Sequence, residues 1–275
     1  MKTIKSTQEL GKCILQKKEI AFIPTMGNLH NGHLALVRKA RSLNKLVLVS
    51  IFVNEIQFNN AADYNSYPRT LKEDLIKLRK ENVDIVFVPN KKQMNTINNF
   101  ITFDLKKMQH GLCDKNRPGH FEGVISIIAR FCNIIRPSYL IMGKKDYQQL
   151  FIVKKFLNEF CYPIKVLSVN TKREQSGLAM SSRNSLIAKK HLLIAPMLYQ
   201  QLTYIKTNLK KMSSLSSIEK KVASELEKNG WKVEYVTIRS QKTLFIPTCN
   251  ERKLVALVAA YLGKVRLIDN IEFCI

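Results

Sequence analysis

The stretch PTMGNLHNGH, Pro24 to His33, decides the fold that we expect. An apolar run, Ile20 to Pro24, predicts a strand that stops at a Gly-containing turn and leads into a helical pattern over Leu29 to Leu43. His30 and His33 lie three residues apart, and residues at i and i+3 share one helix face. The first helical turn also leaves backbone N–H groups unpaired at the positive end of the dipole. Two imidazoles and a set of free amides pointing at one place predict an anion site.

Gly32 lies between the two histidines and removes a side chain where a nucleotide would need close approach. A single histidine is more often a solvated or core residue than a catalyst. The HxGH spacing after a strand raises the expectation of function considerably. By itself it predicts nucleotidyl transfer and nothing finer.

Four further apolar runs predict the remaining strands of one sheet. They cover residues 46–53, 83–88, 139–142 and 164–169, and the first is β-branched enough for a central strand covered on both faces. Helices are expected over 3–18, 123–135 and 147–160, and over a segment to about Glu81 that begins at a capping box of Thr70 and Glu73. Short strands are expected around Phe100 to Asp104. The alternation predicts an α/β fold, a Rossmann-like doubly wound parallel sheet.

The pattern changes after Arg183. Helical segments over about 189–210 and 217–228 precede strands near 233–238, 254–260 and 264–268, which predicts a second, smaller α+β C-terminal domain. We therefore expect a first domain over residues 1–172 and a second over residues 173–275.

Composition limits the class of protein. The 275 residues are 45% hydrophobic, as in an ordinary globular protein. The N-terminal residues lack an apolar signal region, and the longest clean apolar run, Leu254 to Leu262, is too short to span a bilayer. We expect a cytoplasmic protein without a membrane partner. The six cysteines are widely scattered without a CxxC pair, which predicts reduced, mostly buried thiols.

The net charge of +24 and a pI near 9.9 also fit a nucleic-acid-binding protein. Only 12 of the 45 basic residues are Arg, and the lysines are spread along ordinary amphipathic segments instead of forming a basic tail. A solvated basic surface is therefore the favoured interpretation, with no specific nucleic acid as partner. Attraction of anionic substrates and incidental polyanion binding stay open.

Polar stretches follow the predicted strands, where the carboxyl ends of a parallel sheet collect ligand residues. FVNEIQF, Phe52 to Phe58, offers the amides of Asn54 and Gln57 for the hydroxyl or carboxylate oxygens of a small substrate. RPGHFEGV, Arg117 to Val124, offers an arginine and a histidine around a Pro-Gly turn. Read alone, both stretches also fit solvated polar loops.

Two later stretches predict phosphate contacts. GKKDYQQL, Gly143 to Leu150, places a lysine at a strand end, and its Asp146 can accept from ribose hydroxyls or cap a helix. GLAMSSRNS, Gly177 to Ser185, offers hydroxyls, amides and one Arg for the β- and γ-phosphates, or it is a helix-capping loop. KMSS, Lys211 to Ser214, looks like the second signature of class I aminoacyl-tRNA synthetases, but it lies in a link outside the predicted sheet. We place the contact at 180–184 instead.

Taken together, these stretches closely resemble the pantothenate synthetase family, the pantoate–β-alanine ligases of the nucleotidyltransferase superfamily. The match runs in order along almost the whole chain, over PTMGNLHNGH, SIFVNEIQF, YPRTLKEDL, RPGHFEGV, GKKDYQQL, GLAMSSRN and LVALVAAYLGKVRLIDN. HxGH alone would fit several enzymes, so another nucleotidyltransferase, such as an adenylyltransferase or a synthetase-like enzyme, stays as the alternative.

The resemblance implies a two-step reaction that needs Mg²⁺. Pantoate attacks ATP to give pantoyl adenylate and pyrophosphate, and β-alanine then gives pantothenate and AMP. It also implies a homodimer, a nucleotide- and pantoate-binding first domain, and a second domain that acts as a lid. Family roles carry over as follows: His30, His33 and Lys145 for catalysis; Pro24, Met26, Gly32, His33, Gly143, Lys145, Asp146, Met180, Ser181, Ser182 and Arg183 for ATP; Met26, Asn54, Gln57 and Gln149 for pantoate. The metal ligands are unknown.

Four positions depart from the usual family pattern. Glu55 stands where a Pro is common, Lys144 replaces an acidic residue, Cys113 replaces a Glu, and Ser176 replaces an Asp. None of them removes an expected phosphate ligand. The Cys113 departure affects a usual glutamate contact, and Lys144 adds a positive charge next to the expected phosphate site.

Overall fold

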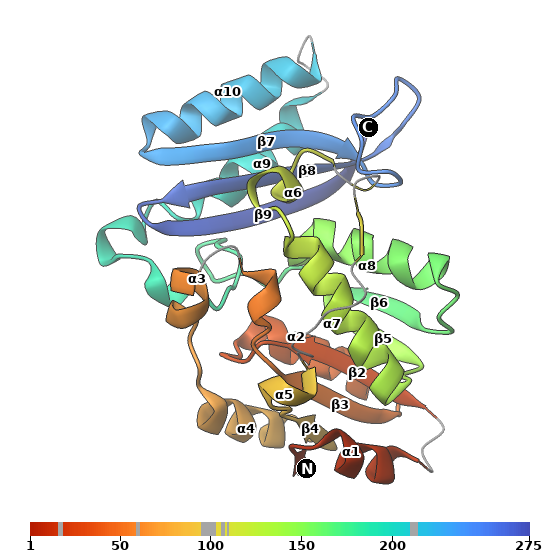
Figure 1. The fold of residues 1–275 in the computed structure, drawn as a ribbon. Helices are drawn as coiled ribbons and strands as arrows, with labels where there is room; N and C mark the ends of the chain where they lie inside the picture. Colours follow the sequence, from red (N-terminus) through yellow and green to blue (C-terminus); the bar gives the residue numbers. More distant parts are fainter. Residues whose placement is uncertain (16–18, 59–60, 95–102, 106–107, 109, 210–213) are drawn as a thin grey trace. The chain divides into compact units, whose positions relative to one another are not determined.

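The computed structural model describes residues 1–275 except 16–18, 59–60, 95–102, 106–107, 109 and 210–213. The described chain forms two compact units (Figure 1). Unit 1 contains residues 1–109, 117–144 and 149–170, and unit 2 contains residues 110–116, 145–148 and 171–275. Two short segments inside the expected first domain thus belong with unit 2. The expected division of roles between residues 1–172 and 173–275 stays a prediction.

Unit 1 is built on a six-stranded sheet in the order β1-β4-β3-β2-β5-β6, in which every strand pair is parallel. Its strands are β1 Lys2–Ile4, β2 Ile20–Thr25, β3 Leu46–Ile51, β4 Ile85–Phe87, β5 Tyr139–Gly143 and β6 Lys165–Val169. The strand after β2 lies on one side of it, and β5 lies on the other. The order in which strands are added therefore reverses between β2 and β5, and a doubly wound sheet binds its ligand outside the carboxyl ends of the strands at such a switch point. The predicted fold class is confirmed.

Helices cover both faces of this sheet. On one face Ala21 and Ile23 of β2 pack with Val37 of α2 and Leu78 of α4 in a buried cluster. Phe22 points to the opposite face, as alternation along a strand requires, and meets Phe131 of α7 with ring centroids 5.3 Å apart. The helices are α1 Thr7–Ile14, α2 Asn31–Arg41, α3 Ala61–Ser66, α4 Leu71–Lys80, α5 Lys91–Met94, α7 His120–Ile135 and α8 Tyr147–Glu159, the last of which begins in unit 2.

Three local predictions for unit 1 need correction or fall outside the structure. The helix expected over 3–18 is shorter, because residues 2–4 pair with β4 and Ser6 caps a helix that begins at Thr7. The capping box of Thr70 and Glu73 is wrong: α4 begins after Thr70, but that side chain caps no amide. Of the strands expected around 100–104, residues 100–102 lie outside the described residues, and 103–104 form no strand.

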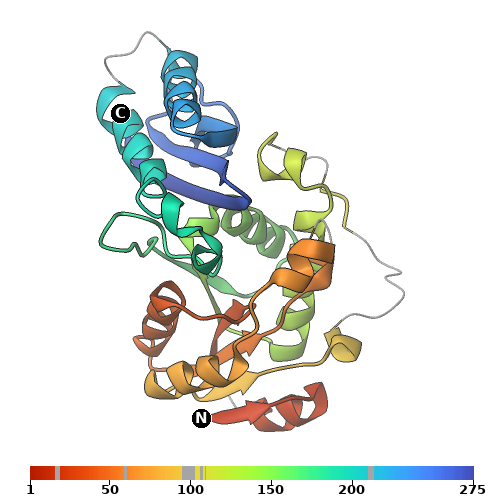
Figure 2. The same ribbon diagram turned by 90° about the vertical axis from the view of Figure 1, so that its left-hand side faces the viewer.

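Unit 2 contains the antiparallel sheet β7-β8-β9 with two helices packed on it (Figure 2). Its elements are α6 Cys113–Asn116, α9 Met197–Asn208, α10 Leu215–Lys228, β7 Trp231–Ser240, β8 Lys253–Leu262 and β9 Val265–Cys274. The smaller α+β domain is confirmed. The first of the two helices predicted for this domain, α9, begins at Met197 and not near 189, because residues 189–191 form only a 3-10 turn. Residues 211–213 of KMSS lie outside the described residues, and Ser214 caps α10.

All six cysteines are free thiols, but the expectation that most are buried is wrong. Cys113 and Cys132 are buried, while Cys161, Cys249 and Cys274 are exposed. Within the part of the chain that the structure describes, no helix combines the length and the apolar character that crossing a bilayer would take.

Candidate active site

The turn between β2 and α2 carries the two histidines. Gly27 and Asn28 both have positive φ, 82° and 50°, which reverses the chain at the carboxyl end of β2. A Cβ on Gly27 would lie 3.1 Å from Oδ2 of Asp74 and 3.2 Å from Ile51, so this position requires glycine. His30 then caps α2, with Pro24, Met26, Gly32 and both histidines half-buried.

Five backbone amides of this turn, those of residues 27–30 and 32, are hydrogen-bonded within the protein, so these five are not the free amides that the sequence predicted. Gly27 N donates to Oγ1 of Thr25, and the N–H groups of Asn28 and Leu29 donate to Asp74 at 2.9 and 2.7 Å. The next two bonds use the histidines themselves: His30 N donates to Nδ1 of His33, and Gly32 N donates to Nδ1 of His30. The turn is consequently a preformed structure.

Two side chains of α4, Asp74 and Lys77, hydrogen-bond to the backbone of the turn. The Asp74 carboxylate is fully buried and accepts the two amides just described, together with the hydroxyl of Thr70 at 3.3 Å. Lys77 Nζ donates to the carbonyl of Leu29 at 2.6 Å. Sequence reasoning quoted YPRTLKEDL as a motif but missed this role. The available signal was an acidic residue at Asp74 on the apolar side of an amphipathic helix.

The hydrogen bonds at Nδ1 set the tautomer of both histidines. A ring nitrogen that accepts a backbone N–H carries no proton, so a neutral ring is protonated at Nε2. The two rings lie with centroids 4.1 Å apart and an interplanar angle of 41°. Both rings can therefore present an N–H donor through Nε2.

A second polar group gathers around Gln57, in the 3-10 turn Glu55–Gln57 after β3. Gln57 Nε2 donates to the sulfur of Met26 at 2.7 Å, and Asn54 Nδ2 lies 3.4 Å from Gln57 Oε1. Asn54 also donates to the carbonyl of Gly123 at 3.0 Å. Its Oδ1 is buried without a hydrogen-bond partner among the described residues. Such an orphaned acceptor suits a hydroxyl donor from a ligand.

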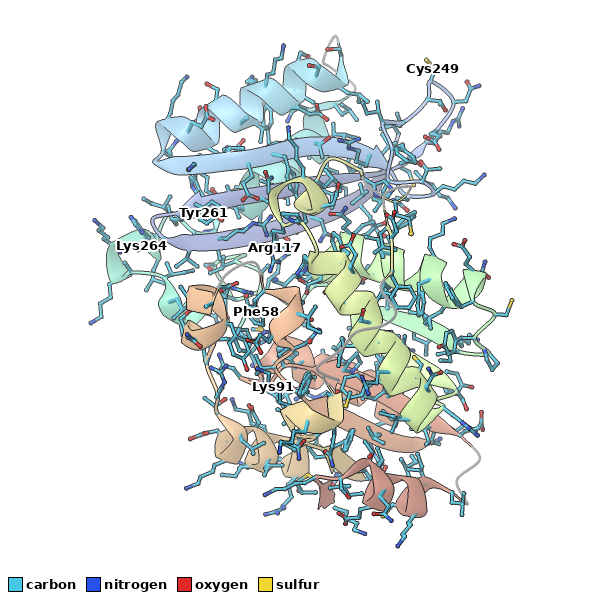
Figure 3. All side chains as sticks on the ribbon, in the orientation of Figure 1. Phe58, Lys91, Arg117, Cys249, Tyr261 and Lys264 are labelled. Carbon is cyan, nitrogen blue, oxygen red and sulfur yellow. The ribbon has the colours of Figure 1, made fainter. Side chains whose placement is uncertain are left out.

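The RPGHFEGV stretch positions this turn and is not only a solvated loop. His120 is buried and donates from Nδ1 to the carbonyl of Gln57 at 2.6 Å, which leaves Nε2 to accept from Arg117 at 3.3 Å. Arg117 also donates to the same carbonyl (Figure 3 labels Arg117 and Phe58). A Cβ on Gly123 would lie 2.9 Å from the backbone of Ile56. The approach of α7 to the turn therefore requires glycine.

The remaining unit 1 residues of the prediction are placed but not joined to these clusters by any described contact. Gly143 ends β5, the neighbour of β2 in the sheet, and Gln149 is half-buried in α8. Glu55, one of the departures from the family pattern, forms an ion pair with Lys91, which Figure 3 labels. With 62% of the Lys91 side chain and 46% of the Glu55 side chain exposed, the pair contributes little stability.

In unit 2, Lys145 and Asp146 follow β5. Lys145 Nζ lies 3.9 Å from Asp146 Oδ1, with 20% and 52% of the two side chains exposed. The next glutamine, Gln148, accepts from Cys113 N and donates to Asp114 at 2.5 Å. Its amide is thus used internally, in contrast to the half-buried Gln149 that sequence reasoning selected.

The predicted pyrophosphate residues follow a small hairpin in unit 2. Arg173 bridges Ala179, and Met180 N donates to the carbonyl of Lys172 at 2.9 Å. At the hairpin tip, Ser176 Oγ accepts from Leu178 N at 3.4 Å, so this serine supplies a local acceptor. Ser181 Oγ accepts from Arg183 N. Met180, Ser181, Ser182 and Arg183 are all half-exposed.

Cys113 lies beside an ion pair between Arg266 and Glu234. Arg266 donates to Glu234 at 2.9 and 2.7 Å, and its Nη2 lies 3.3 Å from Cys113 Sγ. The same sulfur lies 3.1 Å from the hydroxyl of Tyr235, whose pKa burial holds well above its ordinary value. The guanidinium charge is thus balanced by Glu234 within the sheet.

The residues that the structure describes contain no group of three or more His, Cys, Asp and Glu side chains arranged to hold a metal. Mg²⁺ in nucleotide enzymes commonly keeps several waters and is held by substrate phosphates with one or two carboxylates. The half-exposed carboxylate of Asp146 beside Lys145 fits that donor chemistry.

The comparisons with known proteins agree with the predicted family. A family profile described as pantoate-beta-alanine ligase matches residues 1–272. A pantothenate synthetase of Neisseria meningitidis serogroup B is 40% identical over 274 residues, covering 99% of each chain. A pantoate-β-alanine ligase structure from Thermus thermophilus superposes with a TM-score of 0.92 at 34% identity, covering 98% of this chain and 99% of that one.

A further structure is the pantoate-beta-alanine ligase of Francisella tularensis complexed with beta-gamma ATP and beta-alanine. Its TM-score is 0.83 at 33% identity, and the match covers 98% of this chain and 97% of that one. These matches span nearly the full length of every relative named. The sequence motifs, the folds of the two units and the whole-chain matches lead to one conclusion: this chain belongs to the pantoate-beta-alanine ligase family.

Proposed function

We propose that this ligase joins pantoate to β-alanine through a pantoyl adenylate. A pantoate carboxylate oxygen attacks the α-phosphorus of ATP, the bond to the β-phosphate oxygen breaks, and pyrophosphate leaves with the electron pair. The β-alanine amine then attacks the acyl carbon, the bond to the AMP oxygen breaks, and the amine gives up a proton. The complex of the Francisella relative with beta-gamma ATP and beta-alanine supports ATP and β-alanine as substrates.

The observation that carries the proposal is the histidine pair at the switch point of the sheet. Both rings accept backbone N–H bonds at Nδ1, so each neutral ring carries its proton on Nε2. In the proposed site, His30 and His33 donate from Nε2 to phosphate oxygens and stabilise charge as the α-phosphorus becomes pentacovalent. No protein nucleophile is required, because positioning and charge stabilisation supply most of the catalysis in phosphoryl transfer.

Unit 1 also supplies the proposed pantoate pocket. Asn54 Oδ1 is a buried acceptor without a described partner, and Gln57 is fixed beside Met26 by His120 and Arg117. Gln149 is the third polar side chain that we propose for this pocket. A small hydroxy acid offers hydroxyl donors for Asn54 and carboxylate or hydroxyl oxygens for the glutamine amides.

Other groups are proposed to bind ATP. Lys145 acts as a further cation toward the phosphates, and Met180, Ser181, Ser182 and Arg183 hold the departing pyrophosphate. Pro24, Gly32, Gly143 and Asp146 line the nucleotide site. Mg²⁺ bound to the triphosphate, with Asp146 as a carboxylate partner, would neutralise phosphate charge. Residues 173–275 are proposed as a lid that keeps the reactive adenylate from water.

A homodimer in the cytoplasm completes the proposal, as the family resemblance and the sequence composition lead us to expect. The exposed lysines are assigned to a solvated basic surface.

The test is an exchange assay on the full chain. Incubation with ATP, Mg²⁺ and labelled pyrophosphate should return label to ATP only when pantoate is present, because the reverse of the first step consumes pantoyl adenylate. Exchange that ignores pantoate, or that depends on an amino acid instead, would favour the alternative of a different nucleotidyltransferase.

A further inference from the structure

Two consecutive polar residues, Asp269 and Asn270, are buried in β9 of unit 2. Only 3% and 5% of their surfaces are exposed. Polar side chains this deep need bonding partners, because an unpaired buried polar group destabilises the fold. The partner of Asp269 is Arg173, in the hairpin that precedes the proposed pyrophosphate residues, and the partner of Asn270 is the carbonyl of Lys145, a proposed phosphate ligand.

Asp269 binds Arg173 in a bidentate ion pair. Nη1 of Arg173 lies 2.6 Å from Oδ2, and Nη2 lies 3.0 Å from Oδ1. The guanidinium also stacks on the ring of Tyr199 in α9, 3.5 Å from its centroid. A planar cation held by a carboxylate and an aromatic face has one orientation, which a lysine in its place would not reproduce.

Arg173 in turn fixes the hairpin that leads to the proposed pyrophosphate residues. Its Nη1 donates to the carbonyl of Gly177 at 3.1 Å, and its backbone bridges Ala179. Gly177 has a φ of 93°, and a Cβ there would lie 3.2 Å from the ring of Tyr199. Ser181 follows two residues after Ala179. The ion pair therefore sets where the chain enters the Ser181 to Arg183 segment.

Asn270 holds the other segment. Its Nδ2 donates to the carbonyl of Lys145 at 2.9 Å, while its backbone N–H donates to Asp269 Oδ1 at 2.8 Å. Tyr147 adds a bond from its hydroxyl to Glu272 on the same strand, at 2.9 Å. One stretch of β9 thus bonds both to the hairpin base and to the lysine segment.

We propose that Asp269 and Asn270 are positioning residues that set the spacing of Lys145 and the Ser181–Arg183 segment for one pyrophosphate. This inference rests on the proposed function and extends it to residues that touch no substrate. The inference predicts that substitutions at Asp269 and Asn270 affect the two reaction steps differently. Pyrophosphate is present while pantoyl adenylate forms and has left before β-alanine attacks, so a misplaced pair of segments impairs the first step and spares the second.

The experiment compares Asp269→Asn and Asn270→Ala with a matched control, Glu234→Gln. Glu234 forms another well-buried ion pair of this sheet, with side-chain exposures of 12% for Glu234 and 15% for Arg266. Among the described residues that control pair bonds to neither Lys145 nor the hairpin. Two rates are measured on each full-length variant: pantoate-dependent pyrophosphate–ATP exchange over a range of pyrophosphate concentrations, and transfer from synthetic pantoyl adenylate to β-alanine. Thermal unfolding is followed in parallel.

Both test variants should raise the KM for pyrophosphate by about 10-fold or more, because sub-ångström placement governs such contacts, and should keep adenylate transfer within about 3-fold of the original chain. Glu234→Gln should lower the unfolding temperature without this selective change. Equal losses in both rates, or a KM shift no larger than that of the control, would overturn the inference. If Asp269→Asn does not fold, the Asn270→Ala variant tests the inference, since that substitution leaves no buried charge unpaired. Absence of exchange in the unmodified chain would instead contradict the proposed function.

Discussion

The backbone N–H of His30 donates to Nδ1 of His33 at 3.3 Å, and the two imidazole rings stand with centroids 4.1 Å apart. The two nitrogens of each ring thus have different roles. Nδ1 accepts a backbone N–H at the N-terminus of α2, and Nε2 is the nitrogen that we assign to phosphate. Substitutions can separate these roles, because the oxygen of an asparagine side chain can occupy the place of Nδ1 but nothing in that residue reaches the place of Nε2.

His33→Asn should retain the bond from His30 N and the fold but lower the rate of adenylate formation by roughly 10²-fold or more, the scale of losing one transition-state donor. Single-turnover formation of pyrophosphate measures this rate. His33→Gln is the matched control, since its amide nitrogen reaches the place of Nε2 and should restore part of the rate. A near-normal rate in His33→Asn would remove His33 from the catalytic set.

Asp74→Asn should loosen the histidine turn. The carboxylate accepts the amides of Asn28 and Leu29, whereas an asparagine offers one acceptor oxygen and an NH₂ group that faces a donor. We expect a loss of about 1–3 kcal/mol in the free energy of unfolding, the typical cost of a buried unsatisfied group. Urea denaturation checks the stability. Glu73→Gln, an exposed neighbour on the same helix, should leave the stability unchanged. A comparable loss of stability in Glu73→Gln would contradict the assignment of Asp74 as the residue that holds the turn.

Gln57→Ala should weaken pantoate binding more than ATP binding, because it removes an amide from a small polar pocket. Separate KM values for the two substrates in the complete reaction test this. Losses of equal size for both substrates would argue against assigning the Gln57 cluster to pantoate.

Gly123→Ala should have a similar substrate bias through the backbone. Its new Cβ would come within 2.9 Å of Ile56 and of Gln57 N, so the 3-10 turn must shift. We expect a raised KM for pantoate and lower thermal stability. The control is Gly11→Ala in α1, where a Cβ meets nothing within 4 Å and alanine favours the helix. An unchanged pantoate KM in Gly123→Ala would show that the turn tolerates displacement.

Glu219 should make unit 2 less stable as pH rises. Burial raises the pKa of this carboxyl above its ordinary value of 4.5, while the hydrogen bond from Ile238 N opposes the shift. Between the unfolded and the folded pKa the native state holds more protons, so the free energy of unfolding falls with rising pH in that window and stays lower above it. Glu219→Gln should flatten this part of the pH–stability curve.

Denaturation of the full chain at several pH values from about 4 upward, near the ordinary carboxyl pKa, measures the effect. Glu227→Gln, at the exposed end of the same helix, reports the background change. A Glu219→Gln curve that keeps the slope of the unmodified chain would contradict the assignment.

Sequence reasoning succeeded where local pattern and architecture coincide. The apolar run before Pro24 and the continuous run that became β3 are inner strands, and the histidine turn lies at the switch point that a doubly wound sheet requires. The family motifs selected Gln57 for pantoate, and that role stays a prediction. These features depend on residues close together in the chain, whose periodicity is visible in the sequence.

The predictions failed where a side chain binds a partner that its local pattern does not indicate. The hydroxyl of Thr70 donates to Asp74, four residues on, and caps no helix amide. Asp74 accepts the amides of Asn28 and Leu29, which lie 46 and 45 residues earlier in the chain and which the sequence pattern leaves free for an anion. Cys113 meets Tyr235 and Arg266 across separations of 122 and 153 residues. No periodicity encodes such contacts, so the positioning roles of Asp74, Asp269 and Asn270 became apparent only in the fold.

The central claim, an acyl adenylate formed at the α-phosphorus, has a direct isotopic test. Pantoate labelled with ¹⁸O in its carboxylate is converted with ATP, Mg²⁺ and β-alanine, and the products are analysed by mass spectrometry. Attack at the α-phosphorus followed by displacement of AMP predicts one ¹⁸O in AMP, with pyrophosphate unlabelled. Label in inorganic phosphate with ADP as co-product would show an acyl phosphate instead and would contradict the account.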